Sequence, residues 1–272
     1  MDFETILFEV GDDHVATVTI NRPRAMNSFT GRMCEEFEQV WREGIANEHI
    51  HAFVLRASMD CPAFSTGVDV KGGSDKPGTR SALGPNPGNA WFRIDPGAYL
   101  GPRSSKMWKP VITAVHGMAC GGAFYWINES DIVICSEDAT FFDPHVTYGM
   151  TAALEPIGAT YRMPLGDVLR MALLGNDERI SAHTALRLGL VSEVVARDAL
   201  WSRAHELAAI VAAKPPAATQ GTVRAIWESL DLPRSAALGM GMSYTTIGNP
   251  VGTAQVDRAA LMANKAKQFE VR

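Results

Sequence analysis

Cysteine is scarce in this chain, and its spacing excludes most of its usual roles. The 272 residues include only Cys34, Cys61, Cys120 and Cys135. These cysteines form no C-x-x-C pair and do not show the spacing of a metal site. The pattern is also unlike the disulfide framework of a small secreted domain, so we expect a reducing, intracellular compartment and a cytoplasmic protein.

Excess positive charge and long apolar runs are lacking as well. The formal net charge of −5 argues against binding nucleic acid by neutralising phosphates. No apolar run reaches the roughly 18 residues that a membrane span needs, and the N-terminal segment lacks the basic and apolar regions of a signal peptide. With 46% hydrophobic residues, the chain can still bury a substantial core. We therefore expect a soluble globular protein that binds neither nucleic acid nor membranes.

Strands and helices alternate along the first part of the chain, and helices dominate the rest. Thr5–Val10 and His14–Asn21 predict a hairpin, and Thr30 is a plausible cap for an amphipathic helix that runs to about Asn47. Further strands are expected at Ala52–Ala57, Val111–Val115, Asp131–Cys135 and Ala139–Phe142, with a short one ending at Val195. Further helices are expected at Pro164–Leu174, Ser181–Leu188, Asp198–Ala213, Ala217–Ser229 and Pro250–Phe269. The pattern indicates an α/β core over residues 1–196 and a helical region over residues 197–272.

A long segment without periodicity, Gly72–Gly101, interrupts this alternation and is rich in glycine, proline and serine. A loop of this length in a compact domain is usually a cover or a binding loop. Trp91 and Phe92 within it could pack on a ligand or anchor the loop to the body of the protein.

Two glycine turns each follow an apolar strand, one at Gly67 and one at Gly121-Gly122. If these strands are neighbours in one sheet, the main-chain N–H groups of Val68 and Gly122 can converge on one point. Such a pair of donors stabilises a developing oxyanion or enolate, and removal of one donor typically costs about 100- to 1000-fold in rate. An ordinary structural turn is the alternative for either glycine segment alone.

Five segments together resemble the crotonase (enoyl-CoA hydratase/isomerase) superfamily. They are Asn21–Pro23, Ala63–Asp69, Lys109–Gly122, Asp131–Val133 and Ile180–Val191. The resemblance implies a crotonase-like spiral of ββα units, with a C-terminal helical region that forms a homotrimer or a dimer of trimers. It also implies an acyl-CoA thioester substrate whose carbonyl oxygen is bound by the N–H groups of Val68 and Gly122. By the same resemblance, substrate binding falls to Arg24, Ala25, Ala63, Phe64, Ser65, Thr66, Gly67 and Asp69.

The proton-transfer residues depart from the family pattern. Hydratases of the family carry two glutamates, and the matching positions here are Tyr125 and His145. A histidine is a competent acid or base near neutral pH, and a tyrosine can donate a hydrogen bond, although either side chain could simply be packed. Glu155 replaces part of a glycine-rich loop and is a third catalytic candidate, with a solvated loop carboxylate or a helix-start charge as the alternative.

We therefore expect an enzyme that acts on an acyl-CoA thioester through a stabilised enolate, with His145, Glu155 and Tyr125 as the catalytic candidates. Hydration is the generic activity that the resemblance implies. Isomerisation, C–C or thioester hydrolysis, and a non-catalytic acyl-CoA-binding role remain open. We expect no metal and no cofactor beyond the CoA thioester, which is itself the substrate.

Overall fold

The computed structural model describes residues 2–70, 95–263 and 269–271. They fall into two compact units, Met1–Ala213 and Lys214–Arg272. Most of the expected loop Gly72–Gly101, including Trp91 and Phe92, lies outside the described residues, so its role stays a prediction.

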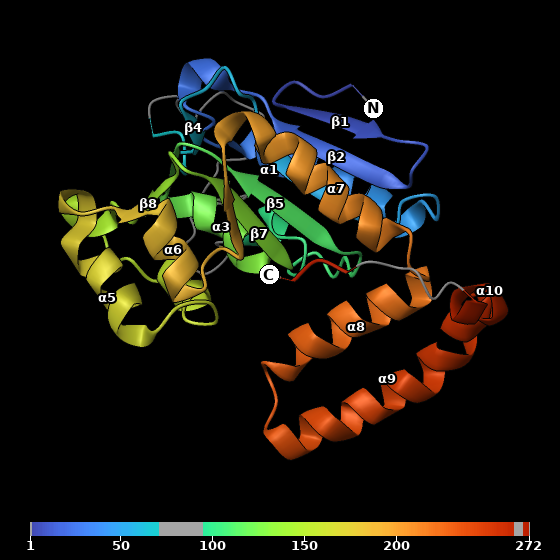
Figure 1. Cartoon of the computed structure of the whole chain (residues 1–272). Helices are drawn as coiled ribbons and strands as arrows, with labels where there is room; N and C mark the ends of the chain where they lie inside the picture. The colour runs from blue at the N-terminus through green and yellow to red at the C-terminus, as the bar shows by residue number, and fades with distance from the viewer. Residues whose placement is uncertain (1, 71–94, 264–268, 272) are drawn as a thin grey trace. The chain divides into compact units, whose positions relative to one another are not determined.

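A six-stranded sheet forms the centre of the first unit (Figure 1). Its strands, in spatial order, are β1 (Ile6–Val10), β2 (Val15–Ile20), β3 (Ala52–Ala57), β5 (Val111–Val115), β7 (Ile132–Ser136) and β10 (Glu193–Val195). The β1–β2 pair is the antiparallel hairpin that the sequence predicts, and the remaining pairs are parallel.

A second, four-stranded sheet carries the segments in which the sequence predicts the site. Its strands, in spatial order, are β4 (Ala63–Ser65), β6 (Met118–Cys120), β8 (Thr140–Phe142) and β9 (Ile180–Ser181). The β4, β6 and β8 strands are mutually parallel, whereas β9 runs antiparallel to β8.

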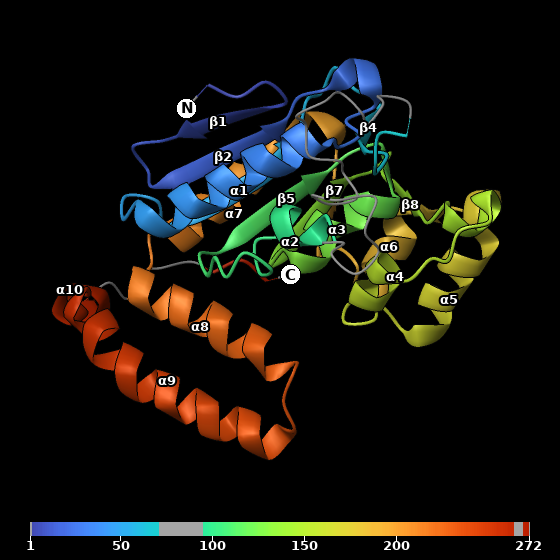
Figure 2. The same cartoon turned by 180° about the vertical axis from the view of Figure 1, so that it is seen from behind.

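Helices cover both faces of the larger sheet, as the two opposite views show (Figures 1 and 2). Helix α1 (Gly31–Ala46) begins at its cap Thr30, whose hydroxyl accepts a hydrogen bond from the Met33 N–H at 3.3 Å. Its side chains Met33, Phe37, Val40 and Trp41 are fully buried against one face of the sheet. Helix α7 (Leu200–Ala212) packs its small residues against the other face. Burial of the apolar side chains of α1 stabilises this helix far more than helix propensity does.

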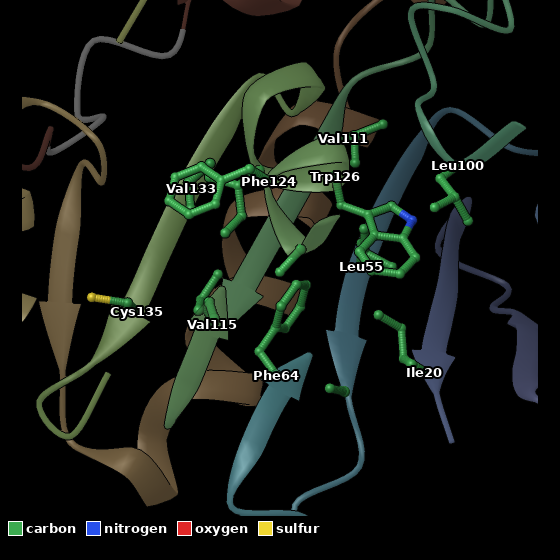
Figure 3. Close-up of a cluster of buried hydrophobic side chains, with 14 of the residues drawn as sticks. Ile20, Leu55, Phe64, Leu100, Val111, Val115, Phe124, Trp126, Val133 and Cys135 are labelled. Carbon is green, nitrogen blue, oxygen red and sulfur yellow. The ribbon is translucent and has the colours of Figure 1, made fainter. Parts of the chain in front are cut away.

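Aromatic side chains of helix α3 (Phe124–Glu129) pack in the hydrophobic core, where Phe124 and Trp126 are labelled (Figure 3). Trp126 lies edge-on to Phe64 of β4 at 6.2 Å between ring centroids and contacts Phe37 of α1 at 5.2 Å. Because Trp126 and Phe64 are both fully buried, the position of α3 relative to the end of β4 is fixed by core packing.

Short helical elements complete the first unit. They are η1 (Pro23–Ala25), α2 (Gly97–Leu100), η3 (Gly121–Ala123), η4 (His145–Tyr148), α4 (Leu154–Ala159), α5 (Leu165–Leu174), η5 (Gly175–Asp177), α6 (Ala182–Leu188) and η6 (Arg197–Ala199). Since α7 packs on the sheet, the compact unit continues to Ala213. The expected division into a core over residues 1–196 and a helical region over residues 197–272 stays a prediction.

The second unit contains a helical hairpin of α8 (Pro216–Ser229) and α9 (Arg234–Ala254), followed by α10 (Arg258–Ala263). The expected helix Pro250–Phe269 is wrong, because α9 begins at Arg234, continues through Pro250 and ends at Ala254, and a separate helix, α10, begins at Arg258. Glycine and threonine are frequent in this stretch and hide its helical character. Its threonine hydroxyls donate back to helix carbonyls, as Thr246 does to the Met242 oxygen at 2.9 Å. In the part of the chain that the structure describes, no helix combines the length and apolarity that crossing a membrane requires.

Gly117 joins the two sheets, because it follows β5, precedes β6 and pairs with Ala63 of β4. It has φ +56°, and a Cβ at this position would overlap the Pro62 carbonyl oxygen. We expect Gly117→Ala to destabilise the protein by about 3 kcal/mol or more, since a left-handed backbone and a steric clash both oppose the methyl group.

Gly149→Ala is the matched control, because Gly149 has φ +72° but open space around the added Cβ. It should cost only about 1–2 kcal/mol. Denaturant midpoints of the two variants measure the difference, and equal losses would show that the clash at Gly117 is relieved by backbone movement.

Candidate active site

Three segments meet at one edge of the smaller sheet. Thr66–Asp69 follows β4, Gly121-Gly122 follows β6, and Asp143–His145 follows β8. Because these strands are adjacent and parallel, their carboxyl ends open at the same edge, where α/β proteins commonly bind ligands. The sheet order therefore places Val68, Gly122 and His145 in consecutive positions.

The N–H group of Val68 is directed by a single β-bridge to Phe29. The Phe29 N–H donates to the Gly67 oxygen at 2.8 Å, and the Asp69 N–H donates to the Phe29 oxygen at 2.9 Å. In a parallel bridge the residue between these two bonds turns its own N–H away from its partner. The Val68 N–H therefore points away from Phe29.

Gly67 and Gly122 bring the two turns into contact. Gly67 has φ +81°, and a Cβ added to it would lie 2.9 Å from the Gly122 nitrogen and 3.2 Å from the Cys120 oxygen. A Cβ on Gly122 would overlap the ring of Phe29. Glycine is required at both positions, and its absence of a side chain brings together the two main-chain segments on which the predicted oxyanion donors depend. Their role as donors stays a prediction.

His145 lies beside this turn and is oriented by Asp143. A Cβ on Gly121 would be 3.6 Å from His145 Cε1. The fully buried Asp143 accepts hydrogen bonds at Oδ1 from the His145 main-chain N–H at 2.9 Å and pairs with His145 Nδ1 at 2.7 Å. This contact favours the tautomer with the proton on Nδ1 and leaves Nε2 as the functional nitrogen. The hydrogen bond that His145 donates to Asp143 raises the pKa of His145.

Glu155 enters the site from α4, and its Oε1 lies 3.8 Å from His145 Nε2. The amide of Asn128 on α3 donates to the Glu155 carbonyl oxygen at 2.8 Å, and Gly158 leaves room for this amide against α4. The Glu155 side chain is only 8% exposed. This burial raises its pKa above the ordinary carboxyl value.

Tyr125 faces Glu155 from α3, and its ring packs edge-on against Phe29 at 6.1 Å between centroids. Burial is the largest of the effects that raise the pKa of Tyr125, and Glu155 and Asp95 add to it. Asp95 is a site residue that the sequence does not indicate, since it stands alone ahead of α2 in no recognisable motif. The structure thus brings the three catalytic candidates, His145, Glu155 and Tyr125, into one cluster.

The expected substrate-binding residues come from two segments, η1 and the β4 strand with the turn that follows it. Arg24 and Ala25 form part of η1, which is joined to the β4 turn by a hydrogen bond from the Thr66 N–H to the Met26 oxygen at 3.2 Å. Arg24 is exposed, whereas Ala63, Phe64 and Ser65 are fully buried.

Burial limits what several of these residues can offer to a ligand. The side chain of Phe64 belongs to the core, so it could present only main-chain atoms. The Asp69 carboxylate forms an ion pair with Arg22 at 2.9 Å. The binding roles of Arg24, Ala25 and the Ala63–Asp69 segment stay predictions.

Asp143, His145 and Glu155 offer ligand atoms within 4.8 Å of one another, the spacing of a possible metal site. However, Asp143 faces Nδ1 of the imidazole and Glu155 faces Nε2. One ion cannot bind both ring nitrogens, so the set fits a proton relay across the imidazole better than a chelate. The expectation of no metal stays a prediction.

A cavity of about 560 Å³ lies on the far side of α4 from this cluster. Ala153, Pro156, Ile157 and Thr160 line it and share one side of the helix. Glu155 and Ala159 are buried on the opposite side. Val146, the neighbour of His145 in η4, also lines the cavity, whereas neither His145 nor Glu155 does.

Comparison with known proteins places this geometry among related folds. The family model described as enoyl-CoA hydratase/isomerase matches residues 11–249. The chain is 33% identical to (E)-benzylidenesuccinyl-CoA hydratase of Thauera aromatica, over 81% of this chain and 82% of that protein. It is 30% identical to the short-chain-enoyl-CoA hydratase of Clostridium acetobutylicum, over 83% and 82% of the two chains. The crystal structure of an enoyl-CoA hydratase/isomerase from Mycobacterium paratuberculosis superposes with a TM-score of 0.84 at 34% identity and covers both chains completely.

The Asp143–His145 contact makes a prediction about titration. Asp143→Asn removes the charge that stabilises the imidazolium, so the pKa of His145 should fall, by about one unit. NMR titration of the histidine rings measures this change, with the His145 signal identified by its loss in His145→Gln.

Asp13→Asn is the control, because Asp13 pairs with a different histidine, His205, at 2.8 Å. It should leave the His145 signal unchanged. An unchanged His145 pKa in Asp143→Asn would contradict the assigned hydrogen bond.

Proposed function

We propose a reaction for this site from one premise: the chain belongs to the enoyl-CoA hydratase/isomerase family. We infer that it adds water across the double bond of an enoyl-CoA thioester. The observation that carries this proposal is the His145–Glu155 pair, 3.8 Å apart, beside the Gly121-Gly122 turn. The pair supplies one base and one acid, although His145 stands at one hydratase glutamate position and Tyr125 occupies the other, on α3.

The thioester carbonyl oxygen is bound by the main-chain N–H groups of Val68 and Gly122. The close approach of Gly67 to Gly122 supports this arrangement, since a Cβ added to Gly67 would lie only 2.9 Å from the Gly122 nitrogen. Preorganised donors of this kind stabilise the negative charge that develops as the carbonyl becomes an enolate. Because the donors polarise the carbonyl, the β-carbon of the adjacent double bond becomes electrophilic.

His145 acts as the base and Glu155 as the acid. Nε2 of His145 takes a proton from water while the water oxygen bonds to the β-carbon, and the π electrons move to the thioester oxygen. The enolate then returns its electron pair to the carbonyl, and the α-carbon takes the proton of the Glu155 carboxyl. Burial favours the protonated carboxyl, and the Asp143 hydrogen bond strengthens the imidazole as a base.

The same two side chains restore their own protonation states. After the addition, His145 is an imidazolium and Glu155 is a carboxylate, with 3.8 Å between Nε2 and Oε1. Return of the proton from one to the other regenerates the starting pair. All steps move protons and electron pairs between water, the substrate and these side chains, so we propose no cofactor and no metal.

Two other reactions use the same groups in different ways. An isomerase would use the pair to remove a proton from one carbon and return it to another, without water. A thioester or C–C hydrolase would use the Asp143–His145 dyad to direct water at a carbonyl carbon. A protein that binds acyl-CoA without turnover is the non-catalytic alternative.

Exposed apolar side chains support self-association of the chain into a trimer or a dimer of trimers. On α9, Leu238, Met242 and Ile247 are each at least 60% exposed. Such residues are unusual on a helix surface that stays in contact with water. We propose that copies of this chain cover them.

The proposed reaction predicts the behaviour of two variants. With crotonyl-CoA and an aryl-substituted enoyl-CoA as substrates, His145→Gln and Glu155→Gln should each lower kcat by about 100- to 10,000-fold, because each removes a proton-transfer group. Loss of the enoyl absorbance measures the rate, and chromatography of the products distinguishes hydration, isomerisation and hydrolysis.

Asp60→Asn, at an exposed loop aspartate, is the control and should retain wild-type turnover. Turnover of Glu155→Gln within threefold of wild type would remove Glu155 from the mechanism. Tight binding without turnover across the substrates would establish the non-catalytic alternative.

The proposed assembly predicts the mass in solution. Light scattering after size-exclusion chromatography should give three or six chains, and Met242→Glu should reduce this number, because a buried charge opposes association. A wild-type monomer at micromolar concentration would contradict the assembly without affecting the proposed chemistry.

A further inference from the structure

Asn128 joins helix α3 to helix α4 through both its side chain and its main chain. Its Nδ2 group donates to the Glu155 carbonyl oxygen at 2.8 Å, near the start of α4. Its own carbonyl oxygen accepts hydrogen bonds from Arg162 Nε at 3.2 Å and from Nη2 at 3.1 Å. Arg162 follows the last residue of α4 by three positions, so a single residue of α3 is bonded near both ends of α4.

The Arg162 guanidinium fixes the end of α3 as well. It donates to the carbonyl oxygen of Ser130, the C-cap residue of this helix, in addition to that of Asn128. A positive charge on the last carbonyls of a helix is favourable, because these groups have no partner within the helix. Arg162 therefore holds the main chain from which the Asn128 side chain extends.

The Asn128 side chain is incompletely hydrogen-bonded although it is buried. The residue is 8% exposed, and no described residue forms a hydrogen bond with its Oδ1. The orientation of the amide is fixed by its neighbour, since only the NH2 group can donate to the Glu155 carbonyl oxygen. A buried polar atom without a partner lowers stability, so leucine, which has a similar shape, would suit a purely structural position at least as well.

Gly158 makes room for the Asn128 amide on the surface of α4. A Cβ at Gly158 would lie 2.5 Å from Asn128 Nδ2, which is too close for the amide to keep its position. Gly158 stands three residues after Glu155, so the two share one side of the helix. Glycine also weakens a helix relative to alanine, so neither residue of this contact favours stability by itself.

The position of α4 determines how the Glu155 carboxyl meets His145. The imidazole is held from its other nitrogen by Asp143, at 2.7 Å. Glu155 Oε1 lies 3.8 Å from His145 Nε2 and is carried by α4. A small rotation or shift of α4 would therefore change this separation while His145 stays in place.

We propose that Asn128 is a positioning residue, which holds α4 where the Glu155 carboxyl faces His145 Nε2. This role accounts for a buried amide with an unpaired oxygen that lies against a helix-weakening glycine. Its effect on turnover rests on the proposed hydration, in which Glu155 is the acid. Its effect on the separation of Glu155 and His145 does not.

Asn128→Leu removes the hydrogen-bond donor and keeps the shape of the side chain. We expect kcat to fall by about 10- to 100-fold, because a displacement of about 1 Å at a reacting group has an effect of this size. KM should stay within about threefold of wild type, since uniform substrate binding is unchanged. The midpoint of denaturant unfolding should equal or exceed that of wild type, because the unpaired oxygen is removed as well.

Thr19→Val is the matched control for this variant. It also replaces a buried polar side chain by an apolar one of similar shape, and it removes the hydrogen bond that Arg56 donates at 3.0 Å in the larger sheet. It should retain wild-type kcat. Wild-type kcat with a lower unfolding midpoint in Asn128→Leu would overturn the inference, because a merely structural residue gives that result.

Gly158→Ala tests the same contact from the side of α4, and it decides the matter if Asn128→Leu does not fold. Its methyl group displaces the amide, so kcat should fall by about tenfold or more. Gly166→Ala on α5 is the control, because an added Cβ there has nothing within 4 Å, and it should retain wild-type kcat. Wild-type kcat in both glycine variants would contradict the role of Asn128.

Crystal structures test the placement of α4 without any turnover. In Asn128→Leu, the separation of His145 Nε2 and Glu155 Oε1 should exceed the wild-type value by about 1 Å or more. A longer separation, in a protein whose wild type hydrates none of the substrates, would support the role of Asn128 and contradict only the proposed hydration. An unchanged separation would overturn the role of Asn128.

Discussion

The contact between Gly67 and Gly122 is the constraint on which the rest of the site depends. Any side chain at Gly67 would meet the Gly122 nitrogen, and any side chain at Gly122 would meet Phe29. At this contact η3 begins directly after the end of β6, and α3 follows it. Helix α3 carries Tyr125 into the site and Asn128 toward α4, and Asn128 then holds the main chain of Glu155. One close approach therefore determines where three side chains can be.

Much of the fold could be predicted from local patterns. The strand Val111–Val115 and the Thr30 cap of α1 lie where the sequence places them, because buried strands and capped amphipathic helices have strong local signals. The strands β4 and β6 are too short for any periodicity to be visible. Helix α9 is hidden for a different reason, since tertiary packing against α8 outweighs its poor helix formers and its internal Pro250.

The site divides in a similar way. Asp143 and His145 are two residues apart, so their interaction could be considered from the sequence alone. The contact between Glu155 and Tyr125 depends on how α4 packs against α3, and nothing local encodes it. The contact of Asn128 with Glu155 is still harder to anticipate, because the amide fits against α4 only in the space that Gly158 leaves open.

Two kinds of chemical group meet at the edge of the smaller sheet, main-chain N–H groups and titratable side chains. The donors expected to hold a carbonyl oxygen are main-chain atoms at Val68 and Gly122, and ordinary substitution at Val68 cannot delete an N–H group. The groups proposed to transfer protons are side chains on η4, α3 and α4, each open to replacement by a single codon change. Evolution can therefore keep the main-chain donors at this sheet edge while it exchanges the side chains around them. Proteins that share the backbone arrangement can then catalyse different reactions.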